Sequence, residues 1–116
     1  MLQLIPQQRL LMAVNPIDFR KGMNSLIAYC EQILAQPPND GTLFIFVNRG
    51  RTAVKILVYD GQGYWLCMKR FSVGKLKWWP KSHDDAYHIG AKQLQVLLYQ
   101  GNPEQADIRP DWHPVD

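Results

Sequence analysis

Cysteine is scarce in this chain, and its two cysteines lie in apolar surroundings far apart. Cys30 falls on the apolar face of an expected helix, and Cys67 falls inside a run typical of a β-strand. Since no CxxC pair occurs, the sequence argues against a thiolate zinc site. We expect both thiols to be reduced core residues, which favours a cytoplasmic location.

Long hydrophobic runs and catalytic motifs are also missing. No apolar run approaches the roughly 20 residues of a membrane-spanning helix, and the N-terminus lacks the features of a signal peptide. Gly61-Gln62-Gly63 falls in an expected hairpin turn, not at a helix start, so it is no nucleotide-binding loop. There is no Gly-x-Ser-x-Gly elbow and no carboxylate pair across a plausible cleft. We therefore expect no enzyme, no cofactor and no membrane partner.

Positive charge is concentrated in one part of the chain. The sequence has 13 Lys and Arg against 10 Asp and Glu, a net charge of +3 at pH 7. Between Thr42 and Lys81 eight basic residues accompany a single acid, Asp60. The length of 116 residues and the 47% hydrophobic content fit one domain over 1–116, with an irregular tail over 102–116.

The same stretch carries the strongest strand signals. Three runs rich in β-branched and aromatic residues are Leu43–Val47, Ala53–Tyr59 and Tyr64–Phe71. They are separated by the short turn sequences Asn-Arg-Gly-Arg and Asp-Gly-Gln-Gly. This pattern predicts a three-stranded antiparallel meander over about 43–71.

Helical spacing of apolar residues occurs on both sides of the meander. Asn15 and Pro16 resemble a helix cap and first turn, so we expect one long helix over about 16–35. A short helix is expected over about 90–100, and Arg9–Val14 fits a further strand. Together these elements predict an α+β domain with a mainly antiparallel sheet and both helices on one face.

The hairpin register predicts where the positive charge gathers. One centring of the Asp60–Gly63 turn pairs Ala53 with Arg70, and the other pairs Arg51 with Arg70. Either register predicts a cationic rim made of Arg49, Arg51, Lys69 and Arg70. Because neighbouring like charges are destabilising, the rim favours an anionic partner. The alternative is a solvated rim that protects the sheet edge from aggregation.

Two further basic segments allow either a binding or a structural interpretation. Arg20 and Lys21 fall in the first turn of the expected long helix, where a bound phosphate would offset them. The alternative is that Arg20 pairs with Asp18.

Aromatic and basic residues alternate over 74–81. The lysines Lys75 and Lys77 would bind phosphates while bases or a partner protein stack on Trp78 or Trp79. The alternative is an edge strand that turns Leu76 and Trp78 toward the core.

His83, Asp84 and His88 form the sequence cluster that most resembles a metal site. Their spacing matches no standard ligand motif, and the acids suit a turn. We expect no metal, and we keep a metal-dependent enzyme only as a distant alternative.

Six short motifs occur in one order along most of the chain. They are Asp18-Phe-Arg-Lys-Gly22, Leu43-Phe-x-Phe-x-Asn-Arg49, Lys55-Ile-Leu57, Asp60-Gly-x-Gly63, Lys69-Arg70 and Gly74-x-Leu-x-Trp-x-Pro80. Together they resemble the second-open-reading-frame (TnpB-type) accessory proteins of insertion-sequence sixty-six transposons. The chain departs from that pattern at Gly90, where the family usually has Ser or Thr, and at Val73, where it often has an acid.

The resemblance implies a small cytoplasmic accessory protein of DNA transposition with no catalytic residues. We expect it to bind DNA backbone or a transposase–DNA complex. The alternative is a protein–protein module that binds the transposase or forms a homodimer. The candidate nucleic-acid-binding residues are Arg20, Lys21, Arg49, Arg51, Lys55, Lys69, Arg70, Lys75 and Lys77.

Overall fold

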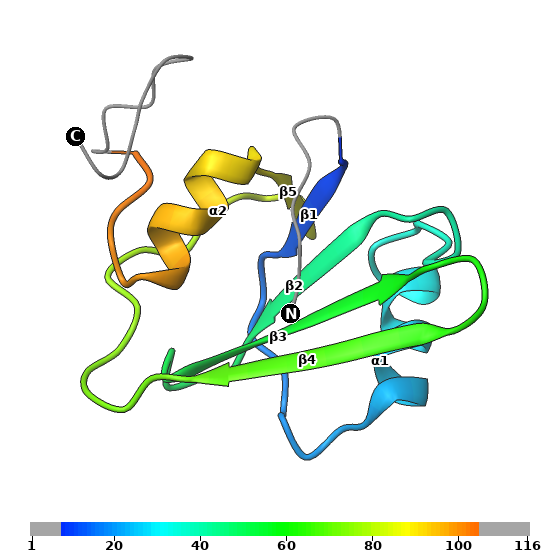
Figure 1. Ribbon diagram of the computed structural model, residues 1–116, viewed down its shortest axis with the longest axis horizontal. Coiled ribbons are helices and arrows are strands. Elements are labelled where there is room, and N and C mark those ends of the chain that lie inside the picture. The colour runs from blue at the N-terminus through cyan, green and yellow to red at the C-terminus, as the bar shows by residue number, and fades with distance from the viewer. Residues whose placement is uncertain (1–7, 105–116) are drawn as a thin grey trace.

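The computed structural model describes residues 8–104 as a five-stranded sheet with two short helices (Figure 1). Within these residues no helix is both long and apolar enough to cross a membrane. In chain order the elements are β1 (Leu10–Ala13), α1 (Met23–Gln32), β2 (Leu43–Val47), β3 (Ala53–Tyr59), β4 (Tyr64–Arg70), β5 (Ala86–His88) and α2 (Ala91–Leu98).

The sheet is mixed, with the strand order β4-β3-β2-β1-β5. β1 runs parallel to β2, and the other neighbouring strands run antiparallel. The prediction of a sheet built as a three-stranded meander is therefore wrong, although β2, β3 and β4 do form consecutive antiparallel hairpins. The sequence pattern missed β5, which has three residues and directly follows Asp84 and Asp85, the acids interpreted as turn residues.

The register of the β3–β4 hairpin matches one of the two predicted alternatives. Ala53 pairs with Arg70 and Val54 pairs with Lys69. Asp60 fixes the turn, since its Oδ1 accepts hydrogen bonds from the backbone N–H groups of Gln62 and Gly63, each at 2.9 Å.

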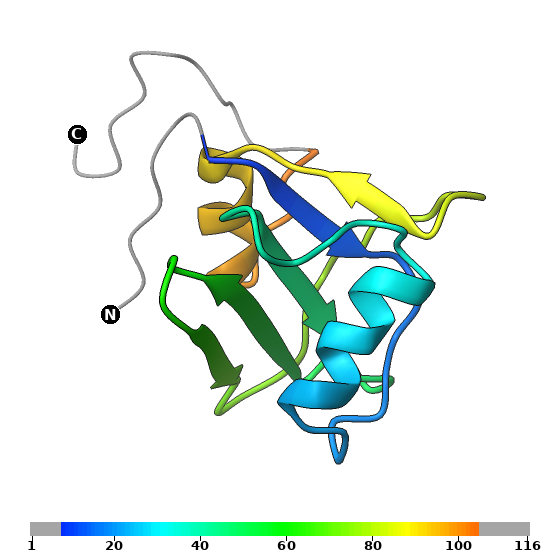
Figure 2. The ribbon, with the colours of Figure 1, turned by 90° about the vertical axis from the view of Figure 1, so that its right-hand side faces the viewer.

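Two hydrophobic clusters lie on opposite faces of the sheet. Leu10 and Met12 of β1 belong to the cluster that α2 covers, whereas Leu11 and Ala13 belong to the cluster that α1 covers. This alternation follows from the two-residue side-chain period of a strand. Figure 2 shows the helices on opposite sides of the strands. The prediction that both helices share a face is wrong, because α1 packs on one of these clusters and α2 packs on the other. The helix α1 lies in the crossover that joins the parallel strands β1 and β2.

The predicted long helix is also wrong, because α1 begins at Met23 instead of Pro16. The chain before it is held along the sheet, where the Ile17 N–H donates to the Val47 carbonyl oxygen at 3.0 Å. The Asp18 carboxylate accepts a hydrogen bond from the backbone N–H of Arg20 at 2.9 Å, which forms a local turn. Arg20 and Lys21 therefore precede the helix instead of lying in its first turn.

The C-terminal end of α1 is set by backbone geometry. Ala35 has a φ of 54°, in the left-handed region, and this conformation interrupts the helical backbone ahead of Pro37. The apolar spacing nevertheless identified the buried side of the helix, since Leu26 and Cys30 are both buried.

Candidate functional site

The turn between β2 and β3 is organised by the side chain of Asn48. Its Oδ1 accepts hydrogen bonds from the backbone N–H groups of Thr52 and Ala53, at 2.9 and 3.2 Å. The Arg51 N–H donates to the Asn48 carbonyl oxygen at 3.1 Å. Arg51 has a φ of 58°, a conformation that ordinarily favours glycine. The hydrogen bonds of Asn48 stabilise this conformation. Arg49 and Arg51 are thus carried on a fixed backbone.

Two pockets meet at this turn and share Asn48 and Arg49 in their walls. The larger has a volume of about 690 Å³, and the smaller has a volume of about 350 Å³. The larger also has apolar walls at Ile17, Phe19 and Met68. Between them the pockets are lined by five cations, which we call the turn-end cluster: Arg20, Arg49, Arg51, Arg70 and Lys81.

One member of the turn-end cluster is paired with a carboxylate. Arg20 Nη2 lies 2.7 Å from Asp18 Oδ2, which confirms the interpretation that these two side chains form an ion pair. Hydrogen bonds from the Arg20 side chain and backbone lower the pKa of Asp18 to about 2, and the Asp18 carboxylate raises the pKa of Arg20. The pair is exposed to solvent.

The other four members have no such partner in the described part of the chain. Within residues 8–104 no carboxylate lies within ion-pair distance of Arg49, Arg51, Arg70 or Lys81. Arg49, Arg70 and Lys81 are exposed, and Arg51 is half-buried. Their charges are therefore available to an anionic ligand in the two pockets.

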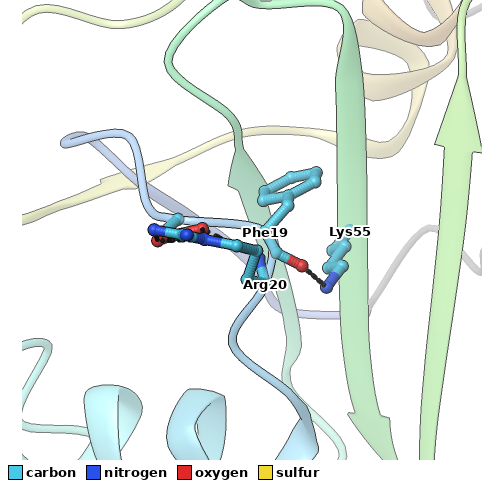
Figure 3. A network of polar contacts seen from close by, with 4 residues as sticks. Phe19, Arg20 and Lys55 are labelled. Atoms are coloured by element: carbon cyan, nitrogen blue, oxygen red, sulfur yellow. Dashed lines mark hydrogen bonds and ion pairs between the residues drawn. The ribbon is translucent and has the colours of Figure 1, made fainter.

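Lys55, another predicted binding residue, is instead buried. Figure 3 shows its side chain directed at the backbone carbonyl of Phe19. Its side chain is only 8% exposed, and its Nζ donates hydrogen bonds to the carbonyl oxygens of Phe19 at 2.8 Å and Lys21 at 3.1 Å. The ammonium also lies 4.9 Å from the centre of the Phe19 ring. Lys55 thus ties the segment before α1 to β3.

Lys69 lies on the opposite face of the sheet from Arg70, because neighbouring strand residues alternate. Its Nζ donates a hydrogen bond of 2.6 Å to the Leu98 carbonyl oxygen at the end of α2, and lies 4.7 Å from the centre of the Tyr99 ring. The predicted cationic rim is therefore divided between two faces, with Arg49 and Arg70 lining one pocket and Lys69 turned toward α2.

The segment from 74 to 81 forms no strand, so the edge strand itself is wrong. The orientation that this alternative predicted is confirmed, since Leu76 is buried and Trp78 packs against the same core cluster. Trp79 is 4% exposed, and its indole N–H is shared between the carbonyl oxygens of Ala13 and Val14, at 3.1 and 3.2 Å. Trp78 is half-buried and packs edge-on against Tyr87. Neither ring is presented as an open stacking surface.

Three other predicted binding cations are exposed to solvent. They are Lys21, which precedes α1, and Lys75 and Lys77 in the segment from 74 to 81.

The structure offers no cluster for metal binding in the described residues. Across 8–104, no three His, Cys, Asp or Glu side chains are grouped so that they could hold an ion, and this includes His83, Asp84 and His88. Both cysteines are free. Burial raises the pKa of Cys30 to about 12, so this thiol is protonated at neutral pH.

Sequence reasoning did not find two of the residues that shape the site, Asn48 and Lys81. The Asn-Arg-Gly-Arg sequence indicated a turn, but nothing local indicated that Asn48 would hold three hydrogen bonds across it. Lys81 reaches the smaller pocket because Trp79 anchors its segment beside Val14. That contact spans 65 residues of sequence and leaves no local signal.

Comparison with known proteins gives relatives over most of the chain. The sequence matches the family described as IS66 Orf2 like protein over residues 8–107. It is 36% identical to the uncharacterized protein y4hO of Sinorhizobium fredii (strain NBRC 101917 / NGR234) over 90 residues, which cover 78% of this chain and 77% of the relative. It is 31% identical to the uncharacterized protein y4jC of the same organism over 90 residues, which cover 78% and 76%. No solved structure matches.

The fold and the site define a small α+β protein with a cationic surface at one end of a mixed sheet. The chain belongs to the IS66 Orf2-like family, whose members are accessory proteins associated with transposition. The predicted resemblance to this family is confirmed.

Proposed function

We propose that this chain is a non-enzymatic accessory protein of transposition that binds DNA backbone, alone or in a transposase–DNA complex, through the turn-end cluster. The observation that carries the proposal is the grouping of Arg49, Arg51 and Arg70 around two pockets that share Asn48 and Arg49, with no carboxylate partner among residues 8–104.

The chemistry of the cluster suits phosphate groups. Arginine donates paired hydrogen bonds from a planar fork that fits phosphate oxygens. The Asn48-centred turn holds Arg49 and Arg51 on a defined backbone, so less freedom is lost when they bind. Contacts of this kind are largely independent of base sequence.

A charge-matched pair of variants tests the proposal. Arg49→Gln with Arg70→Gln removes two cations from the larger pocket. Arg9→Gln with Lys92→Gln removes the same charge outside the pocket walls, since Arg9 adjoins the start of β2 and Lys92 lies in the first turn of α2. Binding to a labelled DNA duplex of arbitrary sequence is measured by fluorescence anisotropy, without and with the transposase.

We expect the pocket variant to bind about tenfold more weakly or worse, since each lost phosphate contact lowers affinity steeply at low salt. The matched control should stay within about twofold of the wild type, because distant charges are screened. Equal binding by the two variants, or no binding by the wild type in either setting, would reject the DNA contact.

A second candidate function is docking of the transposase without direct DNA contact. Exposed apolar side chains on β4 favour it, namely Trp65 at 60% and Met68 at 54% exposed. Trp78 and Trp79 no longer support it, because both pack within the chain. Co-purification with the transposase that survives nuclease treatment would support this candidate, and loss of the complex on nuclease treatment would support the DNA proposal.

A further inference from the structure

The outer edge of β4 is a long strand edge without a partner in the described residues. β4 ends the sheet on one side and has seven residues, whereas the opposite edge strand, β5, has three. Figure 1 shows β4 at the front edge of the molecule. Natural proteins usually shorten or cover such edges, because an open edge pairs readily with another strand.

The hydrogen bonds at both ends of the β3–β4 hairpin fix which groups of β4 face outward. The Phe71 N–H donates to the Thr52 oxygen at 2.9 Å, and the Asp60 N–H donates to the Gly63 oxygen at 3.0 Å. These two pairs continue the β3–β4 register, in which hydrogen-bonded pairs alternate with unbonded pairs. Counting along the strand, Cys67 and Ile56 form a hydrogen-bonded pair, so the N–H and C=O groups of Cys67 face β3. The residues whose N–H and C=O groups face outward are Tyr64, Leu66, Met68 and Arg70.

We propose that β4 pairs with β4 of a second copy of this chain, antiparallel, around a two-fold axis at Cys67. Leu66 then opposes Met68 of the second copy as a hydrogen-bonded pair, and Cys67 opposes Cys67 as an unbonded pair. All of β4 is used, with about eight new backbone hydrogen bonds, whereas moving the axis to Leu66 or Met68 leaves about six. The two sheets join into one, and the symmetric pairing closes without leaving a further long edge.

The side chains of β4 are complementary in this register. Arg70 opposes Tyr64 of the second copy, so this cation meets an aromatic ring. Lys69 opposes Trp65, and its ammonium keeps its bond to the Leu98 carbonyl oxygen of its own chain. The two Arg70 residues lie roughly 20 Å apart along the joined strands. A parallel, in-register pairing would instead set Lys69 and Arg70 beside their own copies, which like-charge repulsion disfavours. The charges of β4 thus select the antiparallel dimer over open-ended stacking.

Cys67 reports on this register directly. Opposed residues of an unbonded antiparallel pair have Cα atoms about 4.5 Å apart, within the range that a disulfide spans. Cys30 is fully buried and serves as an internal control. Treatment of the folded chain with diamide should give a covalent dimer of twice 13.4 kDa on a non-reducing gel. The dimer should persist in Cys30→Ser and disappear in Cys67→Ser.

A displaced thiol controls for random collision. In Cys67→Ser with Lys69→Cys, the exposed thiol is on the same face but two residues from the axis, so the two sulfurs lie about 14 Å apart along the joined strands. This variant should stay monomeric on the gel. Equal crosslinking from positions 67 and 69, or none from position 67, would overturn the proposed register.

Met68→Pro tests the dimer without using a thiol. The Met68 N–H faces outward, so proline removes no bond to β3, but it removes the donor to Leu66 of the second copy. By sedimentation velocity the wild type and Met68→Ala should be dimers, and Met68→Pro should be a monomer with an unchanged circular dichroism spectrum. A monomeric wild type, or a Met68→Pro chain that remains dimeric and crosslinks at Cys67, would refute the proposal. The dimer and its tests do not rest on DNA binding, because they use no DNA and replace none of Arg49, Arg51 and Arg70, although Arg70 belongs both to β4 and to the turn-end cluster.

Discussion

Lys55 lies in the middle of β3, between apolar neighbours on a strand that is mostly buried. Its charge suggested a binding residue, but its Nζ donates to two backbone carbonyl oxygens of the segment before α1. These partners lie 34 and 36 residues away in sequence, so no local pattern indicates them. Residue type alone therefore does not distinguish cations that face solvent, such as Arg49, from cations that stabilise the fold, such as Lys55.

Replacing Lys55 with methionine tests its structural role. Lys55→Met keeps the length of the side chain but leaves the carbonyl oxygens of Phe19 and Lys21 without their donor. We expect the free energy of unfolding to fall by about 1–3 kcal/mol, because unpaired buried acceptors are costly. Lys75→Met, at an exposed position, should change it by less than about 0.5 kcal/mol. Urea denaturation measures both, and equal stabilities would contradict the assigned role.

Asp18 gives a pH-dependent prediction at the same scale. Its pKa is lowered to about 2 in the folded chain from an ordinary value of 3.8, so folding favours the charged form. The stability that this contributes is complete above the ordinary pKa and is lost as the pH falls through about 2. In an NMR titration, Arg20→Gln should move the pKa of Asp18 upward and leave the lowered pKa of Asp40 in place. If the pKa of Asp18 does not change in this variant, Arg20 is not the cause of the lowered pKa.

Among the elements, the β2–β3–β4 hairpins were predicted well and the helix before them poorly. Turn sequences and alternating residues act locally, and they predicted the bounds of β2 and β3 and a β3–β4 register that the structure adopts. The start of α1 depends instead on the Ile17 bond to Val47 and on Lys55, which are tertiary contacts that compete with helix formation. The parallel pairing of β1 with β2 depends on the same crossover and has no local signature.

Gly22 is the N-cap residue of α1, and because it has no side chain the helix lacks a side-chain cap. Its φ of −91° suits any residue, and an added Cβ would meet nothing within 4 Å. We expect Gly22→Ser to raise the free energy of unfolding by about 0.5–1 kcal/mol, through a new cap and a less flexible unfolded chain.

Gly61→Ser is the matched control for this substitution. A Cβ at Gly61 would also meet nothing within 4 Å, but its φ of +96° is a conformation that serine rarely adopts. We expect a loss of about 1 kcal/mol there. A Gly22→Ser variant that is also destabilised in thermal and urea unfolding would contradict the observed helix start.

At the scale of the whole molecule, the two faces of the sheet have different roles. The α1 side carries the larger pocket with Arg49 and Arg70, whereas Lys69 on the other side is occupied by α2. The sequence predicted the density of positive charge but not this division, since it depends on strand alternation and on where each helix packs. In the proposed dimer two turn-end clusters would lie on one continuous face, which suits an extended anion such as a DNA backbone.

The dependence of DNA binding on salt concentration measures how many phosphates the turn-end cluster neutralises. If Arg49, Arg51 and Arg70 each neutralise a phosphate, a plot of log K against log salt concentration should fall with a slope of roughly −2 to −3 per chain. Arg49→Gln with Arg70→Gln should flatten that slope by about 2, and Arg9→Gln with Lys92→Gln should leave it unchanged. A wild-type slope near zero, or a slope that both double variants share, would show that the turn-end cluster does not bind DNA phosphates.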